Sequence, residues 1–155
     1  MTRTPDHLWV EDSGFLKTTE ANVWQLLTDP QLTEQYMYNS QLHADWELGG
    51  KAVWKAQDEN GKWIDHVNAQ VLVYEPFQHL AFTIFHEATD QRSEVQSDLH
   101  YLLEPETNGV RLTIKQGDFA LLKLGKELFE RCQQGWDYVM PQLLKTGETR
   151  FIKPT

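Results

Sequence analysis

The C-terminal third of the chain carries the longest amphipathic pattern in the sequence. From Asp118 to about Thr146, apolar residues recur at steps of three and four, which is the spacing of one face of an α-helix, while Lys, Glu, Gln and Asp fill the other face. We expect Asp118 to cap this helix and Gly147 to end it. The apolar positions are Leu121, Leu124, Leu128, Cys132, Gly135, Trp136, Val139 and Leu143. Such a stripe has to be buried against a large apolar surface, so it constrains the fold more than any other feature.

The preceding residues supply that surface as a series of short alternating runs. Asn60-Gly61 and Asn108-Gly109 are turn signals, and hairpin-linked strands pair antiparallel. Two short helices are expected after the first strand, from Thr19 to Asp29 and from Gln31 to Tyr36. The expected strands are residues 8–16, 39–46, 51–57, 63–74, 80–86, 97–104 and 110–116, with a loop over residues 86–96. The order predicts one α+β domain over residues 1–155, in which a bent antiparallel sheet of about seven strands wraps around the long C-terminal helix.

Composition excludes several classes of partner. The formal charge of −9 argues against a nucleic-acid partner and against docking on an anionic membrane, since both need clustered Lys and Arg. Cys132 is the only cysteine, so no internal disulfide is expected, and its place on the apolar stripe indicates a packed thiol. We see neither a secretory signal nor an apolar run of the roughly 18 residues that a membrane span needs, and therefore expect a cytoplasmic protein.

Several short motifs, in a fixed order, resemble those of a known family. Residues 19–30 end in Thr-Asp-Pro, residues 45–50 form a strand that ends in a glycine turn, and residues 71–83 form a hairpin. Residues 109–114 read Gly-Val-Arg-Leu-Thr-Ile, and the last helix carries Gly135-Trp136 and Leu143-Leu144. Together they resemble the START-like superfamily, also called SRPBCC, and within it the domains grouped with the activator of the ninety-kilodalton heat-shock chaperone ATPase.

The resemblance covers about residues 8–148 and departs from the family pattern at three positions. Val110 replaces a common Thr, Tyr36 stands where Trp is usual, and Gln116 stands where His is frequent. The resemblance implies a helix-grip fold with a cavity between the sheet and the last helix. It implies no reaction, because the family has no shared catalytic signature.

The sequence contains no phosphate-binding loop, no nucleophile elbow and no metal-binding spacing of His or Cys. The six histidines are scattered, and we predict neither a metal nor a cofactor. Two residues are candidate acids or bases: Glu11 on the Trp9 face of the first strand, and His86 in phase with Phe82 and Ile84. His66 and His100 are out of phase with the inward residues, so both are expected to face solvent.

The aromatic residues of the inward faces give the strongest indication of a cavity. Pro141 is expected to kink the last helix and to shape one end of that cavity. The candidate lining residues are Glu11, Trp54, Phe82, Ile84, His86, Tyr101, Phe119, Trp136, Val139 and Met140.

Three functions remain open from the sequence. The first is binding of a hydrophobic or lipid-like small molecule in the cavity. The second is a chaperone-regulating or other interaction module, with a protein partner or a homodimer. The third is an enzyme that moves a proton on an apolar or polyketide-like compound. All three rest partly on fold-level analogy.

Overall fold

The chain folds as a bent sheet with a long helix across it. The computed structural model describes residues 7–86, 96–122 and 124–152, so most of the expected loop at 86–96 lies outside the described residues. The strands are β1 (Val10–Leu16), β2 (Gln41–Ala44), β3 (Lys51–Gln57), β4 (Trp63–Glu75), β5 (His79–Phe85), β6 (Gln96–Glu106) and β7 (Gly109–Gly117). The helices are α1 (Glu20–Thr28), α2 (Pro30–Tyr36), the short 3-10 helix η1 (Phe119–Leu121) and α3 (Gly125–Phe151).

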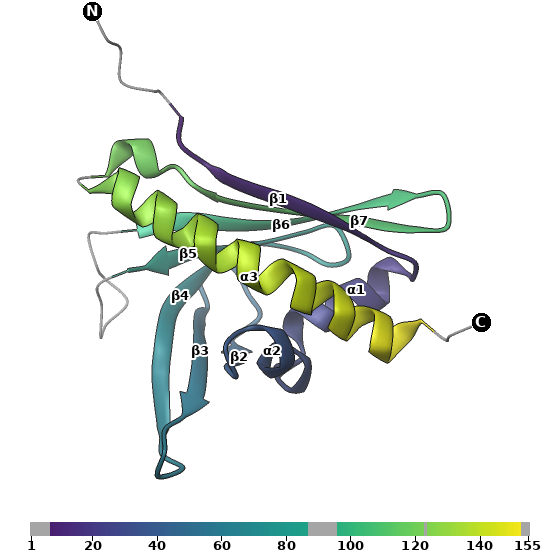
Figure 1. The fold of residues 1–155 in the computed structure, drawn as a ribbon, viewed down its shortest axis with the longest axis horizontal. Coiled ribbons are helices and arrows are strands. Elements are labelled where there is room, and N and C mark those ends of the chain that lie inside the picture. Colours follow the sequence, from purple (N-terminus) through teal and green to yellow (C-terminus); the bar gives the residue numbers. More distant parts are fainter. Residues whose placement is uncertain (1–6, 87–95, 123, 153–155) are drawn as a thin grey trace, which may run out of the picture.

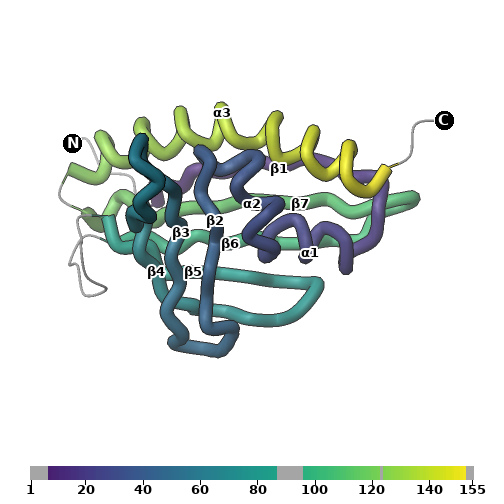
Figure 2. Tube along the Cα trace, turned by 90° about the horizontal axis from the view of Figure 1, so that it is seen from below, coloured from purple at the N-terminus to yellow at the C-terminus, as the bar shows by residue number. Residues whose placement is uncertain are grey.

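All neighbouring strands in the sheet are antiparallel, in the order β1-β7-β6-β5-β4-β3-β2. β2 to β7 form a meander, and β1 joins it beside β7. Figure 1 shows α3 running along the sheet, with α1 and α2 beside its C-terminal half. Figure 2 shows β2, β3 and β4 turned away from the direction of β1 and β7. This architecture confirms the expected α+β helix-grip fold.

A polar side chain caps the N-terminus of each of the two short helices. Thr19 Oγ1 accepts a hydrogen bond from the Asn22 amide at 3.2 Å and caps α1, while Asp29 Oδ1 accepts from the Gln31 amide at 2.9 Å and caps α2. Tyr36 Oη donates to the Leu26 carbonyl at 2.8 Å, which fixes the two helices to each other.

The core fills the space between the concave face of the sheet, α1, α2 and α3. Ala52, Trp54 and Ala56 of β3 are buried as their alternation predicts. Alternation over residues 63–74 predicts that one apolar face is formed by Val67, Ala69, Val71 and Val73. The prediction is wrong for Val73, because the register with β5 shifts between Val71 and Val73. Beyond this irregularity Tyr74 packs against the core, and its ring contacts that of Trp24 edge-on at 5.7 Å.

The last helix begins later than its apolar pattern predicts. Asp118 caps η1 instead, where its Oδ1 accepts from the amides of Ala120 at 3.0 Å and Leu8 at 2.7 Å. Leu124 adopts a left-handed conformation with φ of 63°, and α3 starts only at Gly125. Leu121 and Leu124 are therefore exposed, and they do not belong to the buried stripe.

Gly147 does not end the helix, because α3 continues to Phe151. Gly147 is buried, and a Cβ on it would lie 3.0 Å from the side chains of both Leu16 and Leu26. Gly14 allows a similar approach in β1, since its Cβ would lie 2.7 Å from Leu144 of α3. The helix is continuous through Pro141.

No helix of the described residues is long and apolar enough to cross a membrane.

The crowding at Gly147 leads to a stability prediction. Gly135, in the same helix, has room for a Cβ, whose nearest neighbour is Tyr38 Oη at 3.6 Å. Gly135→Ala should raise the free energy of unfolding by up to about 1 kcal/mol through helix propensity. Gly147→Ala gains the same helix propensity but crowds two buried leucines. Its free energy of unfolding should therefore be about 1–2 kcal/mol lower than that of Gly135→Ala. Urea unfolding of both variants measures the difference, and equal stabilities would contradict the proposed close packing.

Candidate functional site

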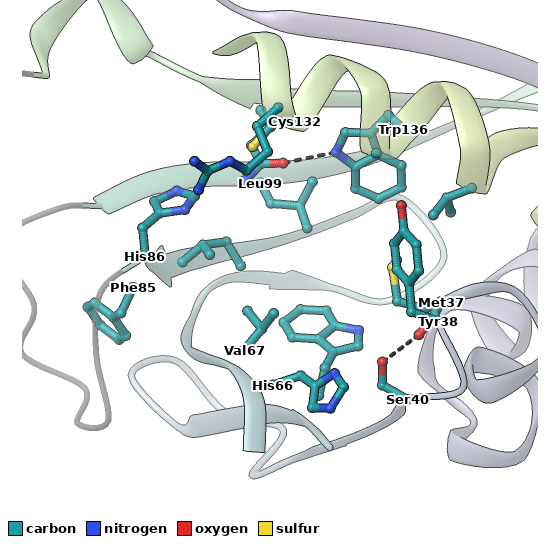
Figure 3. A pocket seen from close by; sticks show the side chains of 16 residues that line it. Met37, Tyr38, Ser40, His66, Val67, Phe85, His86, Leu99, Cys132 and Trp136 are labelled. Carbon is teal, nitrogen blue, oxygen red and sulfur yellow. Dashed lines mark hydrogen bonds between the residues drawn. The ribbon is translucent and has the colours of Figure 1, made fainter. Parts of the chain in front are cut away.

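A pocket of about 460 Å³ lies between the N-terminal half of α3 and strands β3 to β7. The sheet contributes Trp54, Ile84 and Leu99 to its apolar wall, and α3 contributes Trp136 and Val139. These side chains point inward because alternate residues of each strand, and one stripe of the helix, face the core. The full lining comprises Met37, Tyr38, Ser40, Trp54, His66, Val67, Ile84, Phe85, His86, Leu99, Gln116, Arg131, Cys132, Gly135, Trp136 and Val139. Figure 3 shows that Tyr38 and Ser40 lie on one side of the pocket and His86 on another.

A chain of hydrogen bonds crosses the wall of the pocket. Trp136 Nε1 donates to Gln116 Oε1 at 2.9 Å (Figure 3). Gln116 Nε2 donates to Ser97 Oγ at 2.9 Å, and Ser97 Oγ lies 2.6 Å from His86 Nε2. Gln116, Ser97 and Trp136 are buried, so these bonds satisfy polar groups that water does not reach. We call these four residues, Trp136, Gln116, Ser97 and His86, the polar relay.

The direction of the polar relay is fixed by the indole. A tryptophan N–H only donates, so the amide oxygen of Gln116 has to face it and the amide nitrogen has to face Ser97. The Ser97 hydroxyl accepts that bond, and because no other acceptor for its own proton lies among the described residues, we assign that proton to the bond with His86 Nε2. A neutral His86 then carries its proton on Nδ1.

Burial determines the charge of the two titratable groups of the inner wall. Burial, and secondly the charge of Arg131, lower the pKa of His86 below its ordinary value, which favours a neutral imidazole at pH 7. Burial raises the pKa of the Cys132 thiol to about 11, with Arg131 opposing the shift. Cys132 therefore stays protonated and is a poor nucleophile.

Two stacked tyrosines stand at the edge of the pocket. The rings of Tyr38, from the α2–β2 loop, and Tyr138, from α3, are 5.2 Å apart with an angle of 19° between their planes. Ser40 steadies the same loop, because its hydroxyl donates to the Met37 carbonyl. Both tyrosines are about half exposed, so their rings stack at the surface, where the loop meets the helix.

The structure brings five of the ten sequence-predicted residues together in this pocket: Trp54, Ile84, His86, Trp136 and Val139. Four others, Phe82, Tyr101, Phe119 and Met140, are buried but belong to the packed core beside it. Phe119 still contacts His86, at 6.1 Å between ring centroids.

Glu11 requires a correction. It is exposed and pairs with Lys115 across β1 and β7, on the face of the sheet opposite the buried Val10 and Ile114. Adjacent residues of a strand point to opposite faces, so Glu11 points away from the pocket. The expectation that it faces the cavity is wrong.

The two histidines expected to face solvent differ in their placement. His66 is exposed, as expected, but it also lies at the rim of the pocket. His100 is half-buried on the outer face, where its Nδ1 lies 2.8 Å from His79 Nε2. Among the described residues, no three His, Cys, Asp or Glu side chains are grouped so that they could hold a metal ion.

The sequence pattern missed the polar members of the site. Gln116 and Ser97 could have been found, because each stands two residues from a buried apolar residue in its strand, Ile114 and Leu99 respectively. Met37, Tyr38 and Ser40 come from a loop, where no periodicity indicates which side chains point inward.

The polar relay predicts coupled effects on stability. Trp136→Phe removes the donor and leaves the buried Gln116 oxygen without a partner, which should lower the free energy of unfolding by about 1–3 kcal/mol. Adding Gln116→Leu removes that oxygen, so the double variant should be less destabilised than the sum of the two single variants. Urea unfolding of the four proteins measures the coupling; strictly additive effects would show that the bond contributes nothing.

Comparison with known proteins places this fold in a family. Residues 17–148 match the family described as Activator of Hsp90 ATPase homolog 1-like protein. No curated protein gives a significant match.

Solved structures with the same fold come from several bacteria. NE0264 from Nitrosomonas europaea has a TM-score of 0.73 at 18% identity, covering 96% of this chain and 99% of that one. MLL2253 from Mesorhizobium loti has a TM-score of 0.71 at 18% identity, covering 92% and 98% of the two chains. A protein from Arthrobacter aurescens has a TM-score of 0.72 at 18% identity, covering 93% and 88%. At this identity these likenesses show the fold alone.

The family match over residues 17–148 spans most of the chain, and the protein therefore belongs to the Activator of Hsp90 ATPase homolog 1-like family.

Proposed function

We propose that the protein binds a small, largely apolar molecule in the pocket between the sheet and α3. The observation that carries this proposal is the character of the lining, in which Trp54, Ile84, Leu99, Trp136 and Val139 surround a volume of about 460 Å³. Ligand pockets commonly have volumes of about 300–1,000 Å³ and combine apolar walls with a few placed polar groups. The polar relay supplies such groups at one part of the wall.

The placement of the candidate bases favours binding over proton transfer. Glu11 points away from the pocket, and His86 Nε2 already accepts the Ser97 proton. A general base needs a free lone pair within reach of the substrate. The enzyme hypothesis therefore has less support than the binding hypothesis.

Gly135 offers a way to fill the pocket without damaging the fold. It lines the pocket, and its nearest neighbour would lie 3.6 Å from an added Cβ. Gly135→Leu should occupy part of the volume, and it also gains helix propensity. We expect N-phenyl-1-naphthylamine, a neutral fluorescent probe, to bind the wild-type protein saturably and to bind Gly135→Leu at least tenfold more weakly.

Gly135→Ala is the matched control, since it gains similar helix propensity but fills little space. It should bind the probe within about threefold of wild type. Native mass spectrometry of the protein as purified provides an independent search for a retained ligand. The absence of saturable binding, or equal binding by Gly135→Leu, would contradict the proposal.

A second candidate function is regulation of an Hsp90-type chaperone, which the family description names. One structural observation favours a protein partner: Trp63 and Ile64 of β4, next to the Asn60-Gly61 turn, are 45% and 42% exposed. Exposed tryptophans are frequent among the residues that dominate binding energy at protein interfaces.

The chaperone function predicts that the purified protein raises the ATPase rate of purified Hsp90. Trp63→Ala should then raise the protein concentration needed for half-maximal stimulation about tenfold or more, because a central aromatic anchor is lost. Leu48→Ala, at a residue that is 70% exposed, is the control and should leave the effect unchanged. An unchanged ATPase rate at saturating protein would refute this second candidate.

A further inference from the structure

We propose that the ligand of this pocket carries one carboxylate-like anionic group, and that His86 Nδ1 and Arg131 bind this group. The inference rests on the proposed binding function and names the chemical class of the ligand: an apolar body with a single anionic head. It is carried by the distribution of charge around the pocket and by the direction of the polar relay.

The lining differs in charge from the rest of the chain. The sequence holds 23 Asp and Glu against 14 Lys and Arg. In the described part of the chain, sixteen residues line the pocket, and none of them carries a carboxylate. The lining does include Arg131, His66 and His86. In so acidic a chain, the absence of carboxylates among the described lining residues means that none of these residues repels an anion.

The polar relay aims a donor at this region. With Ser97 donating to Nε2, the proton of neutral His86 lies on Nδ1. Among the described residues, the structure pairs Nδ1 with no acceptor. The imidazole is half-buried and lines the pocket, so a ligand oxygen there is the acceptor proposed for its Nδ1–H.

Arg131 supplies the positive charge. Its side chain lines the pocket next to Cys132, and no ion pair engages it among the described residues. Its side chain and that of His86 line the same pocket, and its charge contributes to the lowered pKa of His86. A carboxylate bound there would accept a hydrogen bond from the Arg131 cation and another from the neutral imidazole of His86, and both are charge-assisted because the acceptor is ionised.

The simpler interpretation is a solvated arginine, since Arg131 is exposed and exposed charges contribute little. The two interpretations differ in what they predict for ligand head groups. A solvated arginine gives no preference among ligands with the same body. The proposed site prefers an anion, even though the net charge of −9 opposes anions at long range.

A head-group series on one apolar body tests the proposal. The probes are 2-naphthoate, 2-naphthamide and 2-naphthylmethylammonium, titrated at 0.15 M salt (about 8 Å screening length) and followed by tryptophan fluorescence and calorimetry. We expect 2-naphthoate to bind about tenfold more tightly than the amide and more tightly still than the ammonium. In Arg131→Gln the preference for 2-naphthoate over the amide should fall to within about twofold.

Arg150→Gln is the matched control, because it removes the same charge from the last turn of the same helix. It should retain the full preference, which separates a local site from a change in net charge. His86→Gln should reduce the preference without abolishing it.

The outcomes separate this inference from the binding proposal. Equal affinity for the three head groups, or a preference that survives Arg131→Gln, overturns the anionic site but leaves a generic apolar pocket. Binding of N-phenyl-1-naphthylamine without binding of 2-naphthoate also overturns it. Failure of all four probes to bind counts against the binding function itself.

Discussion

The contact between α3 and the sheet determines the rest of this structure, and it is not uniform along the helix. At the C-terminal half, the missing side chains of Gly14 and Gly147 let the helix approach β1 and α1 closely, and leucine side chains occupy the places where their Cβ atoms would lie. At the N-terminal half, Cys132, Trp136 and Val139 line a pocket instead. A straight helix that packs closely against one end of a bent sheet can lie farther from the sheet at its other end. The interface is therefore tightly packed at the C-terminal half of α3 and contains the pocket at the N-terminal half.

The polar relay provides hydrogen-bond partners for the buried polar side chains beside the pocket. Gln116 and Ser97 occupy inward strand positions beside the pocket, and both side chains are buried. Buried amide and hydroxyl groups without partners cost about 1–3 kcal/mol each, so they are tolerated only when they are bonded to one another. Trp136 bridges helix and sheet by donating to Gln116, and it therefore contributes both apolar area and a fixed hydrogen bond. The same bond orients the Gln116 amide, whose nitrogen then donates to Ser97.

Most of the fold followed from periodicity, and the errors fall where periodicity fails. Alternation in β3 identified the buried Ala52, Trp54 and Ala56, because a strand with one buried face has a strict period of two. The irregularity between Val71 and Val73 shifted that phase, so Tyr74 took the inward position expected for Val73. For the last helix, Leu121 and Leu124 matched the helical spacing but preceded the true start at Gly125, where a Cβ would lie 1.8 Å from the Phe119 carbonyl oxygen. Close backbone approach of this kind leaves no periodic signal in the sequence.

The site was less predictable than the fold for a related reason. Aromatic residues in inward phase were found, but the sequence does not distinguish Trp54, which lines the pocket, from Phe82, which packs two strands away in the core. That distinction depends on how far the helix stands from each strand. The acidic composition led to the expectation of no nucleic-acid partner and no anionic membrane, because binding to such extended polyanions depends on many contacts with clustered Lys and Arg. A small ligand responds instead to the few charges within several ångströms, where the lining carries Arg131 and no described carboxylate. Net charge and local charge therefore lead to opposite expectations, and only the three-dimensional arrangement shows that both can hold in one molecule.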